Sequence, residues 1–132
     1  MPRPTVQLRL LFDTGLSFGP GKADLLDQIA RLGSISAAGR AMQMSYKRAW
    51  GLVEEMNHAF RTPLVTALRG GAGHGGARVT AAGQVVLAQY RRLQAAAQTA
   101  GATEIAAITA ALADPATAPL PKTPTNDMFD KT

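Results

Sequence analysis

The chain lacks cysteine altogether, which excludes a disulfide framework, a thiolate nucleophile and a zinc finger among its 132 residues. It is also poor in aromatic residues, at 5%, although hydrophobic residues reach 46% and suffice for the core of one domain. No apolar run approaches the roughly 20 residues that a membrane-spanning helix requires. The N-terminal segment MPRPTVQLRLLFD has too short an apolar stretch for a signal peptide. We therefore expect a cytoplasmic protein that has no membrane partner.

Groups of residues that could carry catalysis or bind a metal are also missing from the sequence. The histidines His58 and His74 are isolated, and Glu54 and Glu55 are neighbours on a predicted helix, where adjacent side chains point apart. No serine has a His–Asp partnership. The run GAGHGG at 71–76 satisfies the dinucleotide-binding pattern GxGxxG, but a strand pattern follows it where a helix is required. We expect no enzyme, no cofactor and no metal site.

The placement of positive charge favours one class of partner. The chain has 14 Lys and Arg residues against nine Asp and Glu residues, a formal net charge of +5. Eight of the basic residues but only two of the acidic ones fall between Ser34 and Arg92. A basic region of this kind suits a polyanion, and double-stranded DNA is the first candidate. Charge that only keeps the protein soluble is the alternative, and composition does not separate the two.

A strand and a helix are predicted before residue 34. Residues 5–13 alternate with the period of a half-buried strand, and the segment TGLSFGPG is predicted to be a loop. The inward side chains of the strand would be Val6, Leu8, Leu10 and Phe12. From Lys22 the apolar residues return at helical spacing, and Gly33 ends the helix. The inward side chains of the helix would be Leu25, Leu26, Ile29, Ala30 and Leu32.

Two helices joined by a short turn are predicted next. Ser36 is placed to cap a short helix, and Ser45 to cap a longer one that runs to about Phe60. The short helix would turn Ala37, Ala38, Ala41 and Met42 inward. The break at MQM leaves a turn of three or four residues, so the pair forms a helix-turn-helix unit.

The longer helix has the polarity of a DNA recognition helix. Its apolar stripe consists of Ala49, Val53, Met56 and Phe60. Lys47 lies nearly opposite this stripe, Tyr46 and Trp50 lie along one flank, and Arg48 lies along the other. The acidic residues come only in the C-terminal half, so the N-terminal half suits a major groove. For Trp50, packing against the core explains the flank position equally well.

A hairpin and an alanine-rich helix complete the pattern. Leu64–Gly70 and Ala77–Thr80 are β-prone and enclose a glycine-rich tip, with Arg69, His74 and Arg78 as candidate DNA contacts. The helix begins at Ala81 after a possible cap at Thr80, and Gly101 interrupts it. Its apolar positions are Val85, Val86, Leu87, Tyr90, Leu93 and Ala97. This stripe fits either a dimer face or packing within the monomer.

Three motifs, GSISAA, MSYKRAW and the pattern G-A-R-V-T-x-x-G, carry a resemblance that runs from about Leu25 to Leu93. Here the chain resembles the N-terminal DNA-binding domain of the molybdate-responsive ModE family, a winged helix-turn-helix of the LysR type. The resemblance implies that residues 45–50 belong to a recognition helix, 69–78 to a wing and 85 onward to a dimerising helix. Members of that family carry C-terminal oxyanion-binding domains, whereas the residues after Leu93 show no strand pattern. We therefore expect no direct binding of molybdate or tungstate.

The sequence as a whole predicts a mainly α protein with a small β-wing. A winged helix-turn-helix domain would span residues 1–93, the dimerisation helix would continue over 94–113, and 114–132 would form a disordered, proline-rich tail. The predicted function is a nucleoid-associated, sequence-specific transcription regulator that binds a pseudo-palindromic operator as a homodimer and controls molybdenum-related genes. An interaction module or a non-specific architectural DNA-binding protein is the alternative. The candidate DNA contacts are Ser36, Ser45, Tyr46, Lys47, Arg48, Trp50, Arg69, His74 and Arg78.

Overall fold

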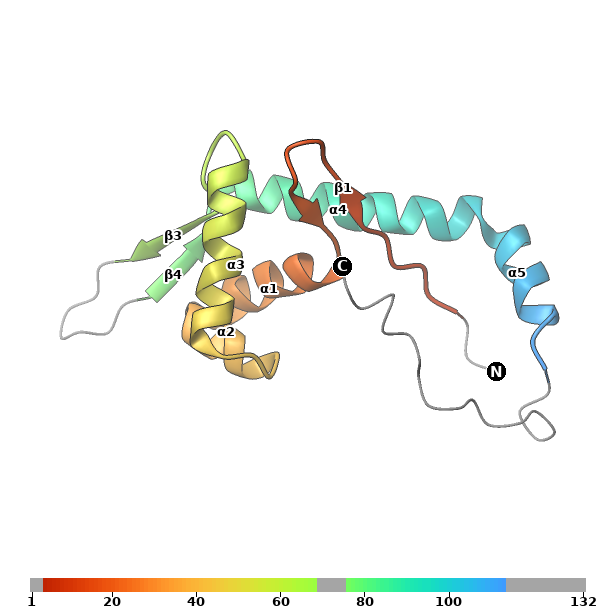
Figure 1. The fold of residues 1–132 in the computed structure, drawn as a ribbon, viewed down its shortest axis with the longest axis horizontal. Helices are drawn as coiled ribbons and strands as arrows, with labels where there is room; N and C mark the ends of the chain where they lie inside the picture. Colours follow the sequence, from red (N-terminus) through yellow and green to blue (C-terminus); the bar gives the residue numbers. More distant parts are fainter. Residues whose placement is uncertain (1–3, 69–75, 114–132) are drawn as a thin grey trace. The chain divides into compact units, whose positions relative to one another are not determined.

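A computed structural model describes residues 4–68 and 76–113 (Figure 1). The elements are β1 (Leu10–Leu11), β2 (Ser17–Phe18), α1 (Pro20–Leu32), α2 (Ile35–Ala41), α3 (Tyr46–Ala59), β3 (Val65–Leu68), β4 (Gly76–Val79), α4 (Ala81–Ala100) and α5 (Ala102–Ala110). Residues 5–100 form one compact unit, and the residues from Gly101 onward belong to a second. The predictions for Arg69, for His74 and for the tail at 114–132 lie outside the described residues.

The core of the first unit lies where α1, α2, α3, the β3–β4 hairpin and the start of α4 meet. Its largest fully buried side chains are Phe18, Leu25, Leu26, Ile29, Met56, Leu64 and Val53. The ring of Phe18 packs edge-on against Tyr90, with centroids 5.3 Å apart, and against Phe60 at 6.4 Å. One aromatic side chain therefore joins the N-terminal segment to both α3 and α4.

The N-terminal strand is shorter than the alternation predicted. Only Leu10–Leu11 pair, antiparallel to Ser17–Phe18, because the chain turns back between residues 12 and 16. Val6, Leu8 and Leu10 are half-buried as expected, but Phe12 lies on the turn and is 44% exposed. The prediction of a loop after residue 13 was partly wrong. Ser17 and Phe18 form β2, and Phe18 is 2% exposed and belongs to the core.

Helix α1 begins at Pro20 rather than at Lys22. Gly19 is its N-cap, and a proline in the first turn loses no helical hydrogen bond because that amide has no partner there. Gly33 ends it in the left-handed conformation, at φ 70°, as predicted. The predicted inward positions Ala30 and Leu32 were wrong, because both side chains are exposed.

The cap of α2 is Ser34, not Ser36. The Ser34 Oγ accepts a hydrogen bond from the Ala37 backbone amide at 3.0 Å, and the helix begins one residue later. Ser36 thus falls in the first turn, where its hydroxyl accepts from Arg40 Nη1 at 3.1 Å. The predicted inward position Ala41 was also wrong, because its side chain is exposed, while Ala38 is fully buried.

A turn of four residues, 42–45, joins α2 to α3 and confirms the helix-turn-helix unit. Gln43 takes a left-handed conformation at φ 59°, which reverses the chain within this short distance. Gly39 lets the two helices approach closely, since a Cβ there would lie 3.1 Å from the Cβ of Ala49. The angle between α2 and α3 therefore depends on a glycine facing an alanine.

Strands β3 and β4 form the predicted wing, with Val65 opposite Val79 and Leu68 opposite Gly76. The predicted cap of α4 is also confirmed, because the Thr80 Oγ1 accepts from the Gly83 amide at 3.0 Å. The same hydroxyl donates to the Pro63 carbonyl at 2.7 Å. One side chain thus caps α4 and ties it to the segment that leads into β3.

Helix α4 holds the N-terminal segment along one side by side-chain hydrogen bonds. Tyr90 donates to the Leu8 carbonyl at 2.6 Å, Gln94 donates to the Val6 carbonyl at 3.2 Å, and Gln98 accepts from the Val6 amide at 2.9 Å. Tyr90, Gln94 and Gln98 follow one another at intervals of four residues, so they share one face of the helix. The segment at residues 6–8 is therefore fixed by side chains rather than by strand pairing.

Arg91 links α4 to α1. Its guanidinium lies 2.9 Å from the Asp24 carboxylate and 2.6 Å from that of Asp27. Hydrogen bonds with these two carboxylates raise the pKa of Arg91, so the side chain stays charged. All three side chains are at least one-third exposed, so the attraction is weakened by solvent and mainly orients the two helices.

Candidate nucleic-acid interface

The N-terminal end of α3 presents cations and an aromatic ring to solvent. Ser45 caps the helix as predicted, its Oγ accepting from the Arg48 amide at 3.0 Å. Tyr46, Lys47 and Arg48 in the first turn are all exposed, and no acidic residue stands there. Because the dipole of a helix makes its N-terminus positive, this end of α3 combines side-chain and backbone charge of one sign.

The buried side of α3 keeps this exposed face turned outward. Ala49, Val53 and Met56 are at most 1% exposed, which confirms most of the predicted apolar stripe. Phe60 is the C-cap and is only partly buried. Since the core fixes the rotation of α3, Lys47 on the opposite side points away from the protein.

Trp50 is not a core residue, which resolves the alternative that the sequence left open. Its side chain is 38% exposed, and its ring stacks on that of Tyr46, with centroids 6.4 Å apart and planes inclined by 10°. Tyr46 itself is 57% exposed. The pair lies four residues apart on α3, so the two rings form one continuous aromatic surface.

A groove runs between this aromatic pair and the wing. Its lining combines the first residues of α2, the flank of α3 and both strands of the hairpin: Ser34, Ile35, Ser36, Tyr46, Trp50, Ala67, Leu68, Gly76 and Ala77. Gly76 lets β4 approach the end of α1 closely, because a Cβ there would lie 3.1 Å from the Gly33 carbonyl oxygen and 3.6 Å from Leu68 Cδ1. Helix-turn-helix and wing thus share one concave surface.

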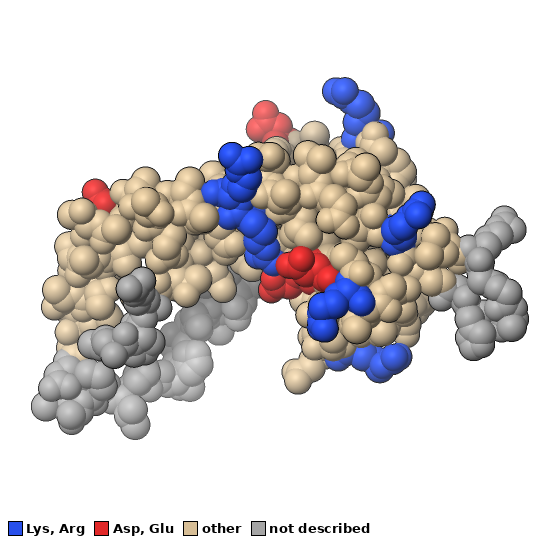
Figure 2. Space-filling model, turned by 180° about the vertical axis from the view of Figure 1, so that it is seen from behind, with Lys and Arg blue, Asp and Glu red and all other residues tan. Residues whose placement is uncertain are grey.

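Exposed basic side chains stand on three of the elements that form this groove. Arg40 on α2, Lys47 and Arg48 on α3 and Arg78 on β4 are exposed. The acidic residues of α1, Asp24 and Asp27, do not line the groove, and their carboxylates pair with Arg91 on α4. Figure 2 shows one face of the molecule, on which acidic side chains gather in a cluster beside basic ones. Of these cations, Arg40 contacts the groove wall, because its Nη1 donates to the Ser36 hydroxyl at 3.1 Å.

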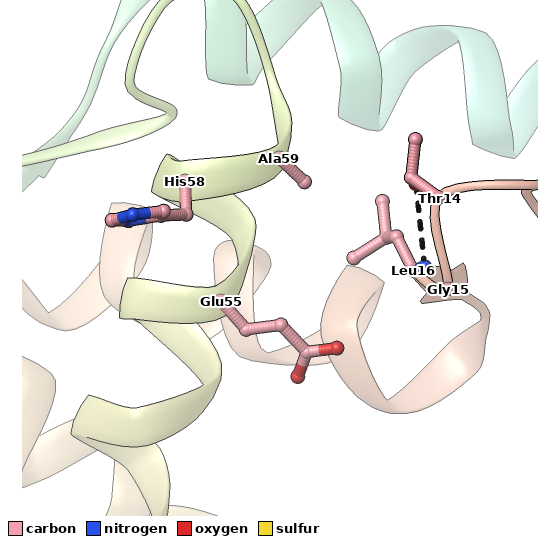
Figure 3. Close-up of a pocket in the computed structure, with 6 residues that line it drawn as sticks. All are labelled: Thr14, Gly15, Leu16, Glu55, His58 and Ala59. Carbon is pink, nitrogen blue, oxygen red and sulfur yellow. Dashed lines mark hydrogen bonds between the residues drawn. The ribbon is translucent and has the colours of Figure 1, made fainter.

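A second pocket lies at the other end of α3, between that helix and the β1–β2 turn (Figure 3). Its lining is Thr14, Gly15, Leu16, Glu55, His58 and Ala59. Glu55 lies 3.4 Å from Lys22 Nζ, and the imidazole of His58 points away from the other labelled side chains. Among residues 4–68 and 76–113, no three His, Asp or Glu side chains gather as metal ligands would.

Two residues that organise the interface were missed from the sequence. Ser34 was passed over for Ser36 as a cap, although Ser34 precedes α2 and Ser36 lies in its first turn. Asn57, at the back of α3, accepts hydrogen bonds from the amides of Leu64 and Val65 and donates to the Val65 carbonyl, at 2.8 to 3.1 Å. An asparagine on a helix gives no sequence signal of such a partner, because the partner is set by tertiary structure.

The arrangement of two helices, a four-residue turn and a hairpin defines a winged helix-turn-helix domain. Residues 22–84 match the family described as bacterial regulatory helix-turn-helix protein, lysR family. The structure of a CbnR DNA-binding domain in complex with DNA is similar at TM-score 0.52 and 23% identity, covering 67% of this chain and 95% of that one. Residues 22–84 are therefore a helix-turn-helix domain of the LysR type, as the sequence predicted.

Within this class, the chain is similar to molybdenum-related proteins. It is 45% identical over 82 residues to the molybdenum-pterin-binding protein MopB of Rhodobacter capsulatus, covering 62% of this chain and 30% of that protein. It is 38% identical over 85 residues to the DNA-binding transcriptional dual regulator ModE of Escherichia coli, covering 64% of this chain and 32% of that protein. The predicted resemblance to ModE is confirmed, and the chain spans about a third of the length of these relatives.

None of the helices that the structure describes is both long and apolar enough to span a bilayer.

Proposed function

We propose that this chain binds double-stranded DNA sequence-specifically and thereby regulates transcription. The observation that carries the proposal is the exposed first turn of α3, with its two cations and no acidic residue, beside a basic wing. In helix-turn-helix proteins, this end of the second helix meets base edges in the major groove. The description of E. coli ModE as a DNA-binding transcriptional regulator supports the same function.

The side chains divide between base and backbone contacts. Lys47, directly outward on α3, donates to guanine O6 or N7, and Trp50 and Tyr46 contact the groove edge. Arg48, Arg78 and the amides of Ser36 and Ser45 donate to phosphates, which set the register. Arg69 and His74, which the sequence predicts as further DNA contacts, lie outside the described residues.

Replacing Lys47 by alanine is expected to weaken binding to the cognate site by about 1–3 kcal/mol, because a bidentate base contact is lost. Fluorescence anisotropy with cognate and random duplexes measures the effect. Arg9→Ala removes the same charge from an exposed position in the N-terminal segment and is the matched control. Equal loss on both duplexes would reassign Lys47 to phosphate, and no change in affinity or salt slope would remove it from the interface.

The proposed assembly is a homodimer through α4. Leu87 and Tyr90 are buried within the monomer, whereas Val85 is 58% and Leu93 is 40% exposed. The side that faces away from the N-terminal segment therefore keeps an apolar surface for a second copy. Two copies would read a pseudo-palindrome with half-sites about one helical turn, or a multiple of it, apart.

The double variant Val85→Asp/Leu93→Asp is expected to weaken dimerisation at least tenfold, about 1.4 kcal/mol, because two carboxylates would lie in an apolar contact. Sedimentation velocity over a concentration series measures the change. Leu11→Asp, at a position 76% exposed on β1, controls for the added charge. A wild-type chain that stays monomeric over the whole series would contradict the assembly.

Selection of bound duplexes from a random DNA pool, followed by competition with random DNA across a salt series, tests the function itself. Enrichment of one motif supports sequence-specific binding. Binding without enrichment, lost steeply with salt, would make the protein a non-specific architectural binder, and no binding would make it an interaction module. We further propose molybdenum-related target genes, as the names of the relatives suggest. Recovery of bound genomic DNA with and without molybdate tests that part.

A further inference from the structure

The aromatic pair on α3 is a surface feature that the fold itself does not require. Tyr46 is 57% and Trp50 is 38% exposed, so packing against the protein accounts for only part of each ring. The two rings lie nearly parallel, with planes inclined by 10° and centroids 6.4 Å apart, and both remain partly open to solvent. Exposed aromatic side chains that are held rigid are typical of surfaces that bind a partner.

The groove beside the pair is lined mainly by apolar side chains. Its walls include Ile35 on α2, Leu68 on β3 and Ala77 on β4 together with the two rings. Exposed cations, namely Arg40, Lys47, Arg48 and Arg78, stand on the elements around it. An uncharged apolar ligand would gain nothing from these cations, and a purely polar anion would gain nothing from the rings.

Duplex DNA combines both properties at one position. Its phosphates are anionic, and the C5-methyl group of thymine is the apolar group that its base pairs display in the major groove. Because Tyr46 and Trp50 occupy the first two turns of α3, they lie at the end of the helix that enters this groove under the proposed function.

We infer that the Tyr46–Trp50 pair is a specificity determinant that reads the C5-methyl group of a thymine in each half-site. This inference rests on the proposed function, since it assumes that α3 lies in the major groove. The rings bury the methyl group and exclude water from it, so the contact distinguishes thymine from cytosine by hydrophobic burial rather than by a hydrogen bond.

Replacing thymine by deoxyuridine removes the methyl group and leaves the base pairing unchanged. With the duplex enriched from a random pool as probe, each thymine is replaced in turn and the affinity of the full chain is measured. Wild-type protein is expected to lose affinity about fourfold for each methyl group removed at the critical position, which corresponds to about 0.8 kcal/mol. At other positions the replacement is expected to have no effect.

Variants then assign the effect to the aromatic pair. In Trp50→Ala and in Tyr46→Ala, deoxyuridine at the critical position is expected to cause no further loss, because the methyl group has already lost its contact. Phe12→Ala removes an aromatic ring that is 44% exposed in the β1–β2 turn, and it should keep the full sensitivity. Thermal unfolding of each variant verifies that it is folded.

The outcomes separate this inference from the function on which it rests. Specific binding that is insensitive to deoxyuridine at every thymine would overturn the inference and leave the proposed function intact. The same holds if both alanine variants remain as sensitive as the wild type, since another residue would then read the methyl group. If no motif is enriched from the pool, the proposed function fails, and the inference fails with it.

Discussion

Replacing Gly83 by alanine is expected to destabilise the first unit by about 3 kcal/mol. A Cβ at this position would overlap the carbonyl oxygen of Leu64 and would lie 2.6 Å from Val79 Cγ1. The carbonyl is backbone and already accepts from the Thr80 amide at 2.9 Å, so it cannot move away without separating the start of α4 from the segment before the wing. The gain of about 1 kcal/mol that alanine brings to a helix is too small to offset this overlap.

Urea or thermal unfolding followed by circular dichroism measures this loss. For a domain of this size, about 3 kcal/mol lowers the midpoint temperature by roughly 12–24 °C. Gly21→Ala is the matched control, because Gly21 also lies in the first turn of a helix, where a Cβ would meet nothing within 4 Å. That variant is expected to be neutral or slightly stabilised. Equal stability of the two variants would show that α4 and the wing are not packed as closely as described.

Replacing Asn57 by alanine is the second change with a large expected effect, about 3 kcal/mol of destabilisation. Its side chain makes three hydrogen bonds to the backbone of Leu64 and Val65. Those two residues are at most 3% exposed, so water cannot readily replace the lost partner. The loss falls at the junction of α3 and β3 and should therefore loosen the wing relative to the recognition helix.

The variant Asn57→Asp tests the acceptor role of this side chain separately from its donor role. The carboxylate still accepts from both amides but has no proton for the Val65 carbonyl, so we expect an intermediate loss of stability. His58→Ala, at an exposed neighbouring position on α3, should change the stability by less than about 0.5 kcal/mol. If Asn57→Ala matches the His58 variant in chemical denaturation, the wing does not depend on this side chain.

The sequence predicted those elements whose signal is local. The apolar spacing of α1 and α3, the serine before α3 and the glycine after α1 each specify structure within a few residues. The two helices and these two end residues were confirmed, although Ala30 and Leu32 of α1 are exposed. The LysR type of the domain was predicted from the family resemblance that three motifs carry, since helical periodicity alone does not distinguish it from other helix-turn-helix domains. The exposed face of α3 followed from the helical period alone.

What the sequence could not predict depends on distant partners. Phe18 stands in a segment rich in glycine and polar residues, and only its contacts with Phe60 and Tyr90 make it a core residue. Trp50 shows the converse, since its flank position allowed packing or exposure and the position of the wing decides between them. The stacking of Trp50 on Tyr46 was compatible with the spacing of four residues but was not required by it.

The attachment of residues 6–8 to α4 has a consequence for the order in which the protein folds. These hydrogen bonds join residues 82 to 92 positions apart, so closing the loop costs more chain entropy than any contact within the helix-turn-helix. We expect the segment to dock after the core has formed and to detach first as the protein opens. The amide of Val6 should then exchange its hydrogen faster than the amides of α1. Detachment of residues 6–8 would therefore remove hydrogen bonds from the C-terminal half of α4, the helix through which we propose that two copies associate.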